Sequence, residues 1–412
     1  WTLYRFDVTP GGVTVAVELA LSENDGVTSL ALLQGDPDEL EALREQVLLP
    51  ALDAFAPLAP EPTPDPSGFA YSSEEVAFPG GSEDVELAGT LTLPDAPGPH
   101  PVVITMTGSG PQDRNESLKP TTLLEPFAII ADALTSAGVG VLRYDDRGVG
   151  GSTGDYSAAT VQELAEDARA AIDYLATRDD VDPERIGLFG HSEGGLYSAM
   201  LGASDERVAF IGMMAPAVID GLSLIVEQNM AITRADGASE EEVQAVGEHA
   251  AALMPLVLEG DTEAAEARLR DFLGRLYDEL PASQQEFAGE RQSFVDLQVD
   301  AQQPNYKSDR YRALLGYHPT ADWAQGDVPV LGIFGGKDVQ VLADSNEAAL
   351  RETLEAAGNE DVTTLTFDDA NHLFQEAVTG AVSEYGELEP EFIDGFTEAV
   401  VDWFVERAGV TG

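Results

Sequence analysis

The strongest structural signal in this chain is the hexapeptide Gly190-His191-Ser192-Glu193-Gly194-Gly195. It follows Ile186–Phe189, a short apolar run typical of a buried strand. Glycines two positions before and after Ser192 permit a tight strand-to-helix turn, because side chains there would strike the neighbouring helix and strand. Such a turn holds the serine hydroxyl clear of the backbone and places the Glu193 amide at a helix N-terminus. The sequence therefore predicts a nucleophile elbow, with Ser192 as nucleophile and the Glu193 amide as an oxyanion donor.

Apolar runs alternate with helical patterns on both sides of this elbow. Further strands are predicted at Pro101–Met106, Gly140–Tyr144, Val208–Met213, Val328–Phe334 and Val362–Phe367. Capping boxes at Thr160–Glu163 and Ser239–Glu242 mark the starts of two helices, and a stripe from Phe392 to Phe404 predicts a closing helix. This alternation predicts an α/β fold whose mostly parallel sheet is covered by helices on both faces.

The first part of the chain has a different composition. Alternating prolines in residues 57–68 favour an extended linker. Before it, residues 1–56 predict a small accessory segment with a β-hairpin that turns at Asn24-Asp25-Gly26. A helix is expected there from about Pro37 to Phe55, with Asp36 as its N-cap.

After the linker, we expect the α/β core over residues 69–215 and 321–412, and a helical cap over residues 216–320. An insertion at this point lies above the carboxyl ends of the strands, where open α/β sheets bind their ligands. Apolar residues at the cap entrance, Met214 and Leu222 among them, indicate an acyl pocket, although core packing explains them equally well.

The chain is strongly acidic, with 75 Asp and Glu against 21 Lys and Arg and a net charge of -54. A field of this sign repels phosphate backbones and argues against a nucleic-acid partner. Molar salt shortens the Debye length to about 3 Å and screens such self-repulsion, so we expect a salt-adapted, halophilic protein. An ordinary acidic surface from a low-salt source is the alternative. The absence of cysteine excludes disulfides, a thiolate nucleophile and a Cys-ligated zinc.

No uninterrupted apolar run approaches the ~18 residues of a membrane span, so we expect a soluble protein. The sequence opens on Trp1 without a signal-peptide pattern, which leaves open whether a leader was removed or the sequence was cut. The location is open too, with an extracytoplasmic, high-salt environment slightly favoured over the cytoplasm. The oligomeric state is also open.

A serine elbow in an α/β sheet predicts an acid after a later strand and a histidine after the last one. Asp338 follows the strand at Val328–Phe334, and His372 follows the strand at Val362–Phe367. Asp338 alone fits a helix N-cap or turn residue equally well, but its place before His372 makes it the predicted acid. Asp344 is its chief competitor. The remaining histidines, which fit this order less well, are His100, His191, His249 and His318.

A second oxyanion donor is expected at the glycine-rich end of the strand Pro101–Met106. There, the Ser109 amide can reach a carbonyl oxygen without obstruction by a side chain. Gly108, Gly110 and His191, which lies beside the elbow, are candidate pocket residues. A plain strand-end turn is the alternative.

Two glycine-rich stretches that suggest nucleotide binding fail in detail. Thr153 replaces the last glycine of a dinucleotide fingerprint, and Gly336-Lys337 lacks the rest of a Walker A loop. No helical pair of histidines and no Asp-rich calcium loop occurs either. The sequence therefore predicts no metal and no cofactor.

Together, these motifs over residues 69–412 resemble the α/β-hydrolase superfamily. Within it, they are most similar to serine esterases related to dienelactone hydrolase and the prolyl-oligopeptidase-like acyl hydrolases. The resemblance rests on Gly108–Arg114, Arg143–Gly148, Gly190–Gly195 and Asp369–Phe374. Members often carry a small N-terminal domain, and residues 1–56 look like its remnant. Thr107 stands where many relatives have histidine, and Glu193 stands where peptidases often have tyrosine, which argues against peptidase activity.

The resemblance and the motifs imply a serine carboxylesterase. We expect it to hydrolyse short to medium acyl esters, small-molecule substrates, through an acyl-enzyme on a triad of Ser192, His372 and Asp338. An acyl thioesterase or a serine exopeptidase on the same triad is the alternative, although the acidic surface would repel anionic acyl-CoA. A more remote alternative is a non-catalytic homologue that only binds ligands.

Overall fold

The computed structural model describes residues 1–8, 15–24, 27–35, 40–54, 71–119 and 121–410. The chain forms two compact units: Trp1–Asp65 with Glu266–Pro304, and Pro66–Ala265 with Asn305–Gly412. The predicted turn residues Asp25 and Gly26, the predicted N-cap Asp36 and the predicted linker 57–68 lie outside the described residues.

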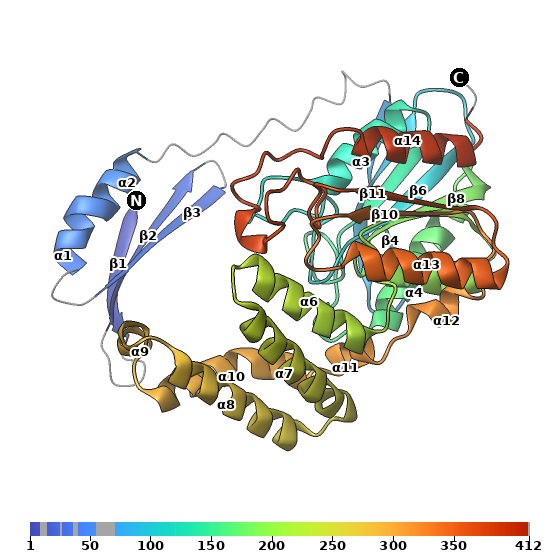
Figure 1. Ribbon diagram of the computed structural model, residues 1–412. Helices are drawn as coiled ribbons and strands as arrows, with labels where there is room; N and C mark the ends of the chain where they lie inside the picture. The colour runs from blue at the N-terminus through green and yellow to red at the C-terminus, as the bar shows by residue number, and fades with distance from the viewer. Residues whose placement is uncertain (9–14, 25–26, 36–39, 55–70, 120, 411–412) are drawn as a thin grey trace. The chain divides into compact units, whose positions relative to one another are not determined.

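The larger unit is built on an eight-stranded sheet with the strand order β11-β10-β9-β8-β6-β7-β5-β4 (Figure 1). Its strands are β4 (Tyr71–Pro79), β5 (Glu86–Pro94), β6 (His100–Met106), β7 (Gly140–Tyr144), β8 (Val181–His191), β9 (Val208–Met214), β10 (Val330–Gly335) and β11 (Val362–Phe367). The strands from β6 to β11 pair in parallel, which confirms the predicted mostly parallel sheet. Strands β4 and β5 pair antiparallel and were not predicted, because polar and small residues interrupt their apolar positions.

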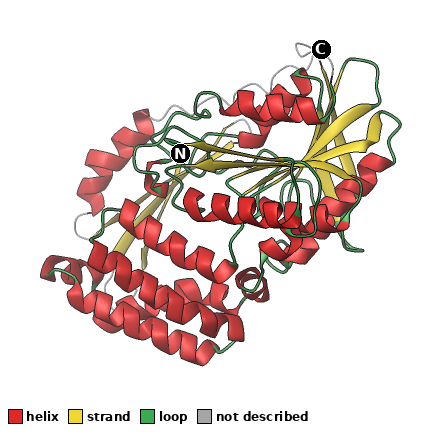
Figure 2. Ribbon diagram, turned by 45° about the vertical axis from the view of Figure 1, so that its right-hand side comes forward, coloured by secondary structure: helices red, strands yellow, loops and turns green. Residues whose placement is uncertain are grey.

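Helices cover both faces of this sheet (Figures 1 and 2). On one face lie α4 (Val161–Ala176), α5 (Gly194–Ser204) and α13 (Ala343–Ala357). On the other face lie α3 (Pro126–Ser136) and α14 (Phe396–Arg407). The predicted two-sided covering is therefore confirmed.

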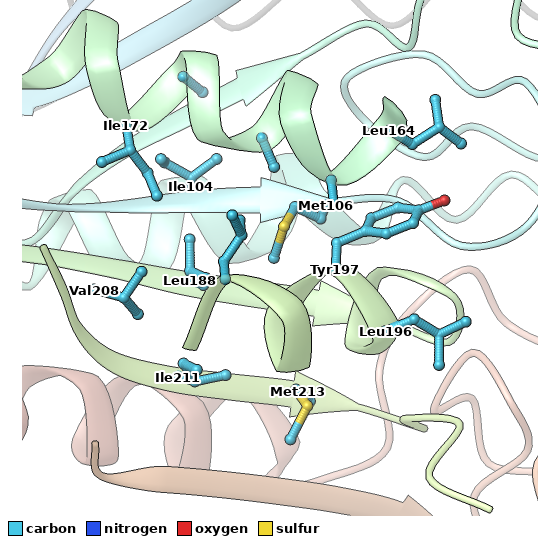
Figure 3. Close-up of a cluster of buried hydrophobic side chains, with 14 of the residues drawn as sticks. Ile104, Met106, Leu164, Ile172, Leu188, Leu196, Tyr197, Val208, Ile211 and Met213 are labelled. Carbon is cyan, nitrogen blue, oxygen red and sulfur yellow. The ribbon is translucent and has the colours of Figure 1, made fainter. Parts of the chain in front are cut away.

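Successive residues of one strand alternate between these two faces. Leu188 of β8 lies in the same buried cluster as Ile172 of α4 (Figure 3). The next residue, Phe189, makes an edge-on contact with Phe404 of α14 in the second cluster. The central strands, which lie between these two layers of helices, are thus buried on both faces. This burial explains their uninterrupted apolar sequences.

Both predicted capping boxes are present. The side chains of Thr160 and Ser239 accept hydrogen bonds from the backbone of Glu163 and Glu242, and each glutamate bonds back to the cap. Ser239 thereby begins α7.

Further helices follow β9. In the larger unit these are α6 (Gly221–Ala235), α7 (Glu240–Glu259), α11 (Asp309–Leu315) and α12 (Pro319–Trp323). Helix α8 (Thr262–Glu279) passes into the smaller unit, which also holds α9 (Ala282–Ala288) and most of α10 (Arg291–Lys307). The segment expected as one cap, residues 216–320, is therefore divided between the two units.

The smaller unit begins with an antiparallel sheet of three strands, β1 (Thr2–Val8), β2 (Val15–Asn24) and β3 (Val27–Gly35). The helical segments that follow are α1 (Leu40–Leu43), a π-helical stretch (Arg44–Leu48) and α2 (Leu49–Ala54). Leu48 and Leu52 pack against Ala20 of β2. The pairing of β2 with β3 agrees with the predicted hairpin, and β1 adds a strand that the sequence analysis did not foresee.

Candidate active site

Ser192 sits in the turn between the end of β8 and the start of α5. Its φ of 51° lies in the left-handed region, which non-glycine residues rarely adopt. The neighbouring glycines make this turn possible, because a Cβ on Gly194 would lie 2.3 Å from the Met106 carbonyl oxygen. A Cβ on Gly190 would lie 2.5 Å from the backbone of Gly194. The chain thus meets the steric requirement of the predicted elbow.

Asp338 and His372 are brought together from loops that follow neighbouring strands. His372 Nδ1 lies 2.7 Å from Asp338 Oδ2, and each of the two residues is only 5% exposed. Asp338 Oδ1 accepts the backbone N–H groups of Gln340 at 2.7 Å and Val341 at 2.9 Å. The carboxylate therefore acts as a turn residue through one oxygen and pairs with His372 through the other. The competitor Asp344 lies in the first turn of α13.

Ser192 and His372 line one cavity of about 420 Å³. The core contributes Gly108, Ser109, His191 and Glu193 to its wall. The apolar part of the wall, from the helical segments and the loops before them, includes Ile219, Leu224, Ile225, Leu314 and Tyr317. A nucleophile candidate, an imidazole and an apolar chamber therefore share one site.

Three predicted pocket residues are not among those that line this cavity. Gly110 uses its amide to donate to the Tyr156 hydroxyl at 2.9 Å. Met214 is fully buried in the cluster between the sheet and α3 and α14, because strand alternation turns it to that face. Leu222 packs against the cluster that contains Leu253 of α7. These three residues therefore do not line this cavity, whereas Gly108 and His191 do.

The loop after β6 is fixed residue by residue. Gly108 N–H donates to Glu116 Oε1 at 2.7 Å, and the Ser109 hydroxyl donates to Glu193 Oε2 at 2.8 Å. Gln112 N–H donates to Asp146 Oδ2 at 2.9 Å. Within the part of the chain that the structure describes, the N–H groups of Ser109 and Glu193 have no acceptor. These two amides are thus left available beside Ser192.

Glu193 is a buried carboxylate, and the sequence analysis assigned a role in the site only to its backbone amide. Its side chain is 2% exposed and also accepts hydrogen bonds from Tyr197 and from Arg310, at 2.6 Å in the second case. Burial and the Glu193 carboxylate together raise the pKa of the Tyr197 hydroxyl well above its ordinary value. Tyr197 therefore remains a hydrogen-bond donor at physiological pH.

A second buried acid, Glu116, contacts His191 behind the elbow. Glu116 Oε1 lies 2.7 Å from His191 Nδ1, and His191 Nε2 lies 3.1 Å from the carbonyl oxygen of His372. Burial alone would lower the pKa of His191, but the Glu116 carboxylate and the His372 carbonyl outweigh it and raise that pKa. His191 thereby links the loop after β6 to the backbone of His372.

Asp146 completes the acidic residues around this loop. Burial raises its pKa to about 8, against the opposing hydrogen bonds from the Gln112 amide and the Thr107 hydroxyl. The negative charges of Glu116 and Glu193 act in the same direction as burial. Burial thus favours the protonated form of Asp146. No three His, Cys, Asp or Glu side chains gather as a metal site in the described ranges. None of the described helices is long and apolar enough to cross a membrane.

Comparisons with known proteins agree with this architecture. The model of the alpha/beta hydrolase family matches residues 116–384, which confirms the predicted fold class. Esterase EstD of Thermotoga maritima is 28% identical over 287 residues, or 70% of this chain and 58% of its own length. The putative hydrolase YtaP of Bacillus subtilis is 34% identical over 125 residues, 27% of this chain and 42% of its own length. The chain thus spans less than two thirds of either relative. Among solved structures, the Pyrococcus furiosus esterase Pf2001 is 16% identical with a TM-score of 0.48, over 85% of this chain and 96% of its own.

Proposed function

Since this chain belongs to the alpha/beta hydrolase family and has esterase relatives, we propose that it is a serine carboxylesterase for short to medium acyl esters. The observation that carries the proposal is the pairing of His372 with Asp338 beside a cavity that Ser192 also lines. A serine in a strained elbow, an imidazole and a buried carboxylate are the three groups that acyl transfer through serine requires.

In the proposed reaction, Ser192 Oγ attacks the ester carbonyl carbon while His372 Nε2 accepts the hydroxyl proton. Asp338 keeps the proton of His372 on Nδ1 and stabilises the imidazolium that forms. The amides of Ser109 and Glu193 donate to the oxygen that becomes negative. His372 then gives its proton to the departing alcohol, and a water molecule releases the acid by the same steps in reverse order.

The cavity favours uncharged esters. Its volume of about 420 Å³ falls within the ~300–1,000 Å³ of small-molecule sites. Arg310 is the only lysine or arginine among the described residues that line it, and its charge is paired with Glu193. An anionic substrate would therefore find no uncompensated cation in the wall, and the net charge of -54 would repel it further. We also propose that the protein is salt-adapted, on the strength of this charge.

A substrate panel tests the proposed specificity. We expect p-nitrophenyl esters of short to medium acyl chains to be hydrolysed with higher kcat/KM than matched thioesters or amino-acyl anilides. A fluorophosphonate probe should label Ser192 in the same preparation. Preferred turnover of thioesters or anilides would assign the triad to a thioesterase or an exopeptidase. Absence of both labelling and turnover would favour a protein that only binds ligands.

A further inference from the structure

The Glu193 carboxylate presents an electrostatic problem beside the proposed oxyanion site. Glu193 immediately follows Ser192, and its own amide is one of the two proposed oxyanion donors. Ser109 carries the other proposed donor, its backbone amide. Its side-chain hydroxyl donates a hydrogen bond to Glu193 Oε2 at 2.8 Å. A buried negative charge at this point opposes a second negative charge on the reacting oxygen. The site therefore needs a cation next to Glu193.

Arg310 of α11 supplies that cation. Its Nη2 lies 2.6 Å from Glu193 Oε1, and the guanidinium carbon lies 4.6 Å from the centre of the Tyr156 ring. Burial alone would lower the pKa of Arg310, but the Glu193 carboxylate outweighs it, so that the pKa is raised. Arg310 Nη1 is buried without a partner among the described residues, so the guanidinium is held chiefly from its Nη2 side.

Arg310 also reaches the loop after β6 by a second route. Its Nη2 donates to the Tyr156 hydroxyl, which accepts the Gly110 N–H at 2.9 Å. Ser109 and Gly110 are thus each connected to Arg310 through one side chain, Glu193 in the first case and Tyr156 in the second. These contacts close a ring that passes through Ser109, from its side-chain hydroxyl to the peptide bond that links it to Gly110.

We propose that Arg310 is a positioning residue of the reaction: it neutralises the Glu193 carboxylate and, through Glu193 and Tyr156, holds the Ser109 amide in place for the oxyanion. The inference rests on the proposed esterase function. It makes the catalytic competence of the core depend on a residue of α11, which lies outside the sheet and its covering helices. Arg310 lines the cavity but makes no hydrogen bond to Ser192 or His372 among the described residues, so we expect its loss to affect the transition state more than substrate binding.

Four variants test this role: Arg310→Met, Glu193→Gln, the double variant of both, and Arg312→Met. Arg312 is the matched control because it lies on the same helix and pairs with Asp309, outside the cavity wall. Each is assayed for kcat and KM with p-nitrophenyl butyrate, and its fold is checked by circular dichroism and thermal unfolding.

We expect Arg310→Met to lower kcat by at least about tenfold with KM changed less than about threefold, because a misplaced or opposed oxyanion donor affects the transition state. The double variant should recover activity relative to Arg310→Met, because glutamine removes the uncompensated charge and still offers an oxygen to Ser109. Arg312→Met should match the wild type.

The proposal is overturned if Arg310→Met keeps the wild-type kcat, or if the two substitutions are additive in a double-mutant cycle. Should Arg310→Met fail to fold, Tyr156→Phe cuts the second route alone and should lower kcat without changing KM. An unchanged kcat in Tyr156→Phe would then refute the ring. Failure of the esterase proposal itself would appear differently, as a wild type without ester turnover.

Discussion

His372 Nδ1 lies 2.7 Å from Asp338 Oδ2, while the other oxygen of that carboxylate is held by the backbone amides of Gln340 and Val341. A carboxylate fixed in this way cannot turn from the imidazole without losing two hydrogen bonds. Nδ1 of His372 therefore carries the proton, and Nε2 is left as the nitrogen that can accept one.

From this relationship we predict that Asp338→Asn lowers kcat by about 10³- to 10⁴-fold, because an amide that donates to Nδ1 favours the wrong tautomer. Steady-state hydrolysis of p-nitrophenyl butyrate measures the effect. Asp344→Asn, in the first turn of α13, is the control and should retain activity. An active Asp338→Asn, or an equal loss in both variants, would remove Asp338 from the proposed triad.

Gly194→Ala is predicted to disrupt the elbow. The added Cβ would meet the Met106 carbonyl oxygen at 2.3 Å, and backbone on both sides must move to relieve the clash. We expect a loss of about 1–3 kcal/mol in the free energy of unfolding, together with a loss of esterase activity. Gly326→Ala is the matched control, because its Cβ would meet its nearest neighbour at 3.5 Å. Equal stability and activity of the two variants would contradict the steric account.

The raised pKa of Asp146 predicts that the free energy of unfolding depends on pH. Its pKa rises from 3.8 to about 8 in the folded protein, so the folded state binds the proton more tightly than the unfolded chain does. The resulting stabilisation is present in full below the unfolded pKa and is lost as the pH rises toward about 8.

Asp146→Asn tests this dependence because asparagine keeps the neutral form at every pH. Denaturant unfolding at constant molar salt should show the stability of the wild type falling relative to the variant between about pH 5 and pH 8, by at most about 1.4 kcal/mol per pH unit. Above that range the difference should level off. Parallel curves for the two proteins would show that Asp146 does not hold its proton.

The charge of -54 predicts that salt stabilises the fold. At about 3 M KCl the Debye length is shorter than the typical spacing of surface charges, so the carboxylates no longer repel one another over distance. We expect a higher midpoint of thermal unfolding at about 3 M than at about 0.1 M, with NaCl as a check against an ion-specific effect. Equal midpoints would refute salt adaptation.

Local patterns were enough to predict the parallel strands, the elbow and the two capping boxes, because each depends on residues close in sequence. Asp338 and His372 were proposed from the order of the strands, and the structure brings their side chains together. Strands β4 and β5 were not predicted, because polar and small residues interrupt their apolar positions. Met213 and Met214 show a limit of such patterns: strand alternation buries them in the two clusters on opposite faces of the sheet, and neither residue lines the cavity.

The contact between Glu193 and Arg310 could not be predicted. The two residues are 117 positions apart, and Arg310 belongs to no recognisable motif. Glu193 stood out only as a departure from the residue that peptidases often have at its position. A buried carboxylate is stable only when it is paired, and the structure shows that Arg310 is the cation that pairs with Glu193.

The most direct test of the proposed mechanism is the hydrolysis of p-nitrophenyl butyrate by Ser192→Ala. The hydroxyl is the only group that the substitution removes, and the fold is expected to persist because alanine keeps the Cβ of the elbow. We predict that kcat/KM falls by about 10³-fold or more, with the circular dichroism spectrum unchanged. Full retention of activity in the folded variant would contradict the assignment of Ser192 as the nucleophile.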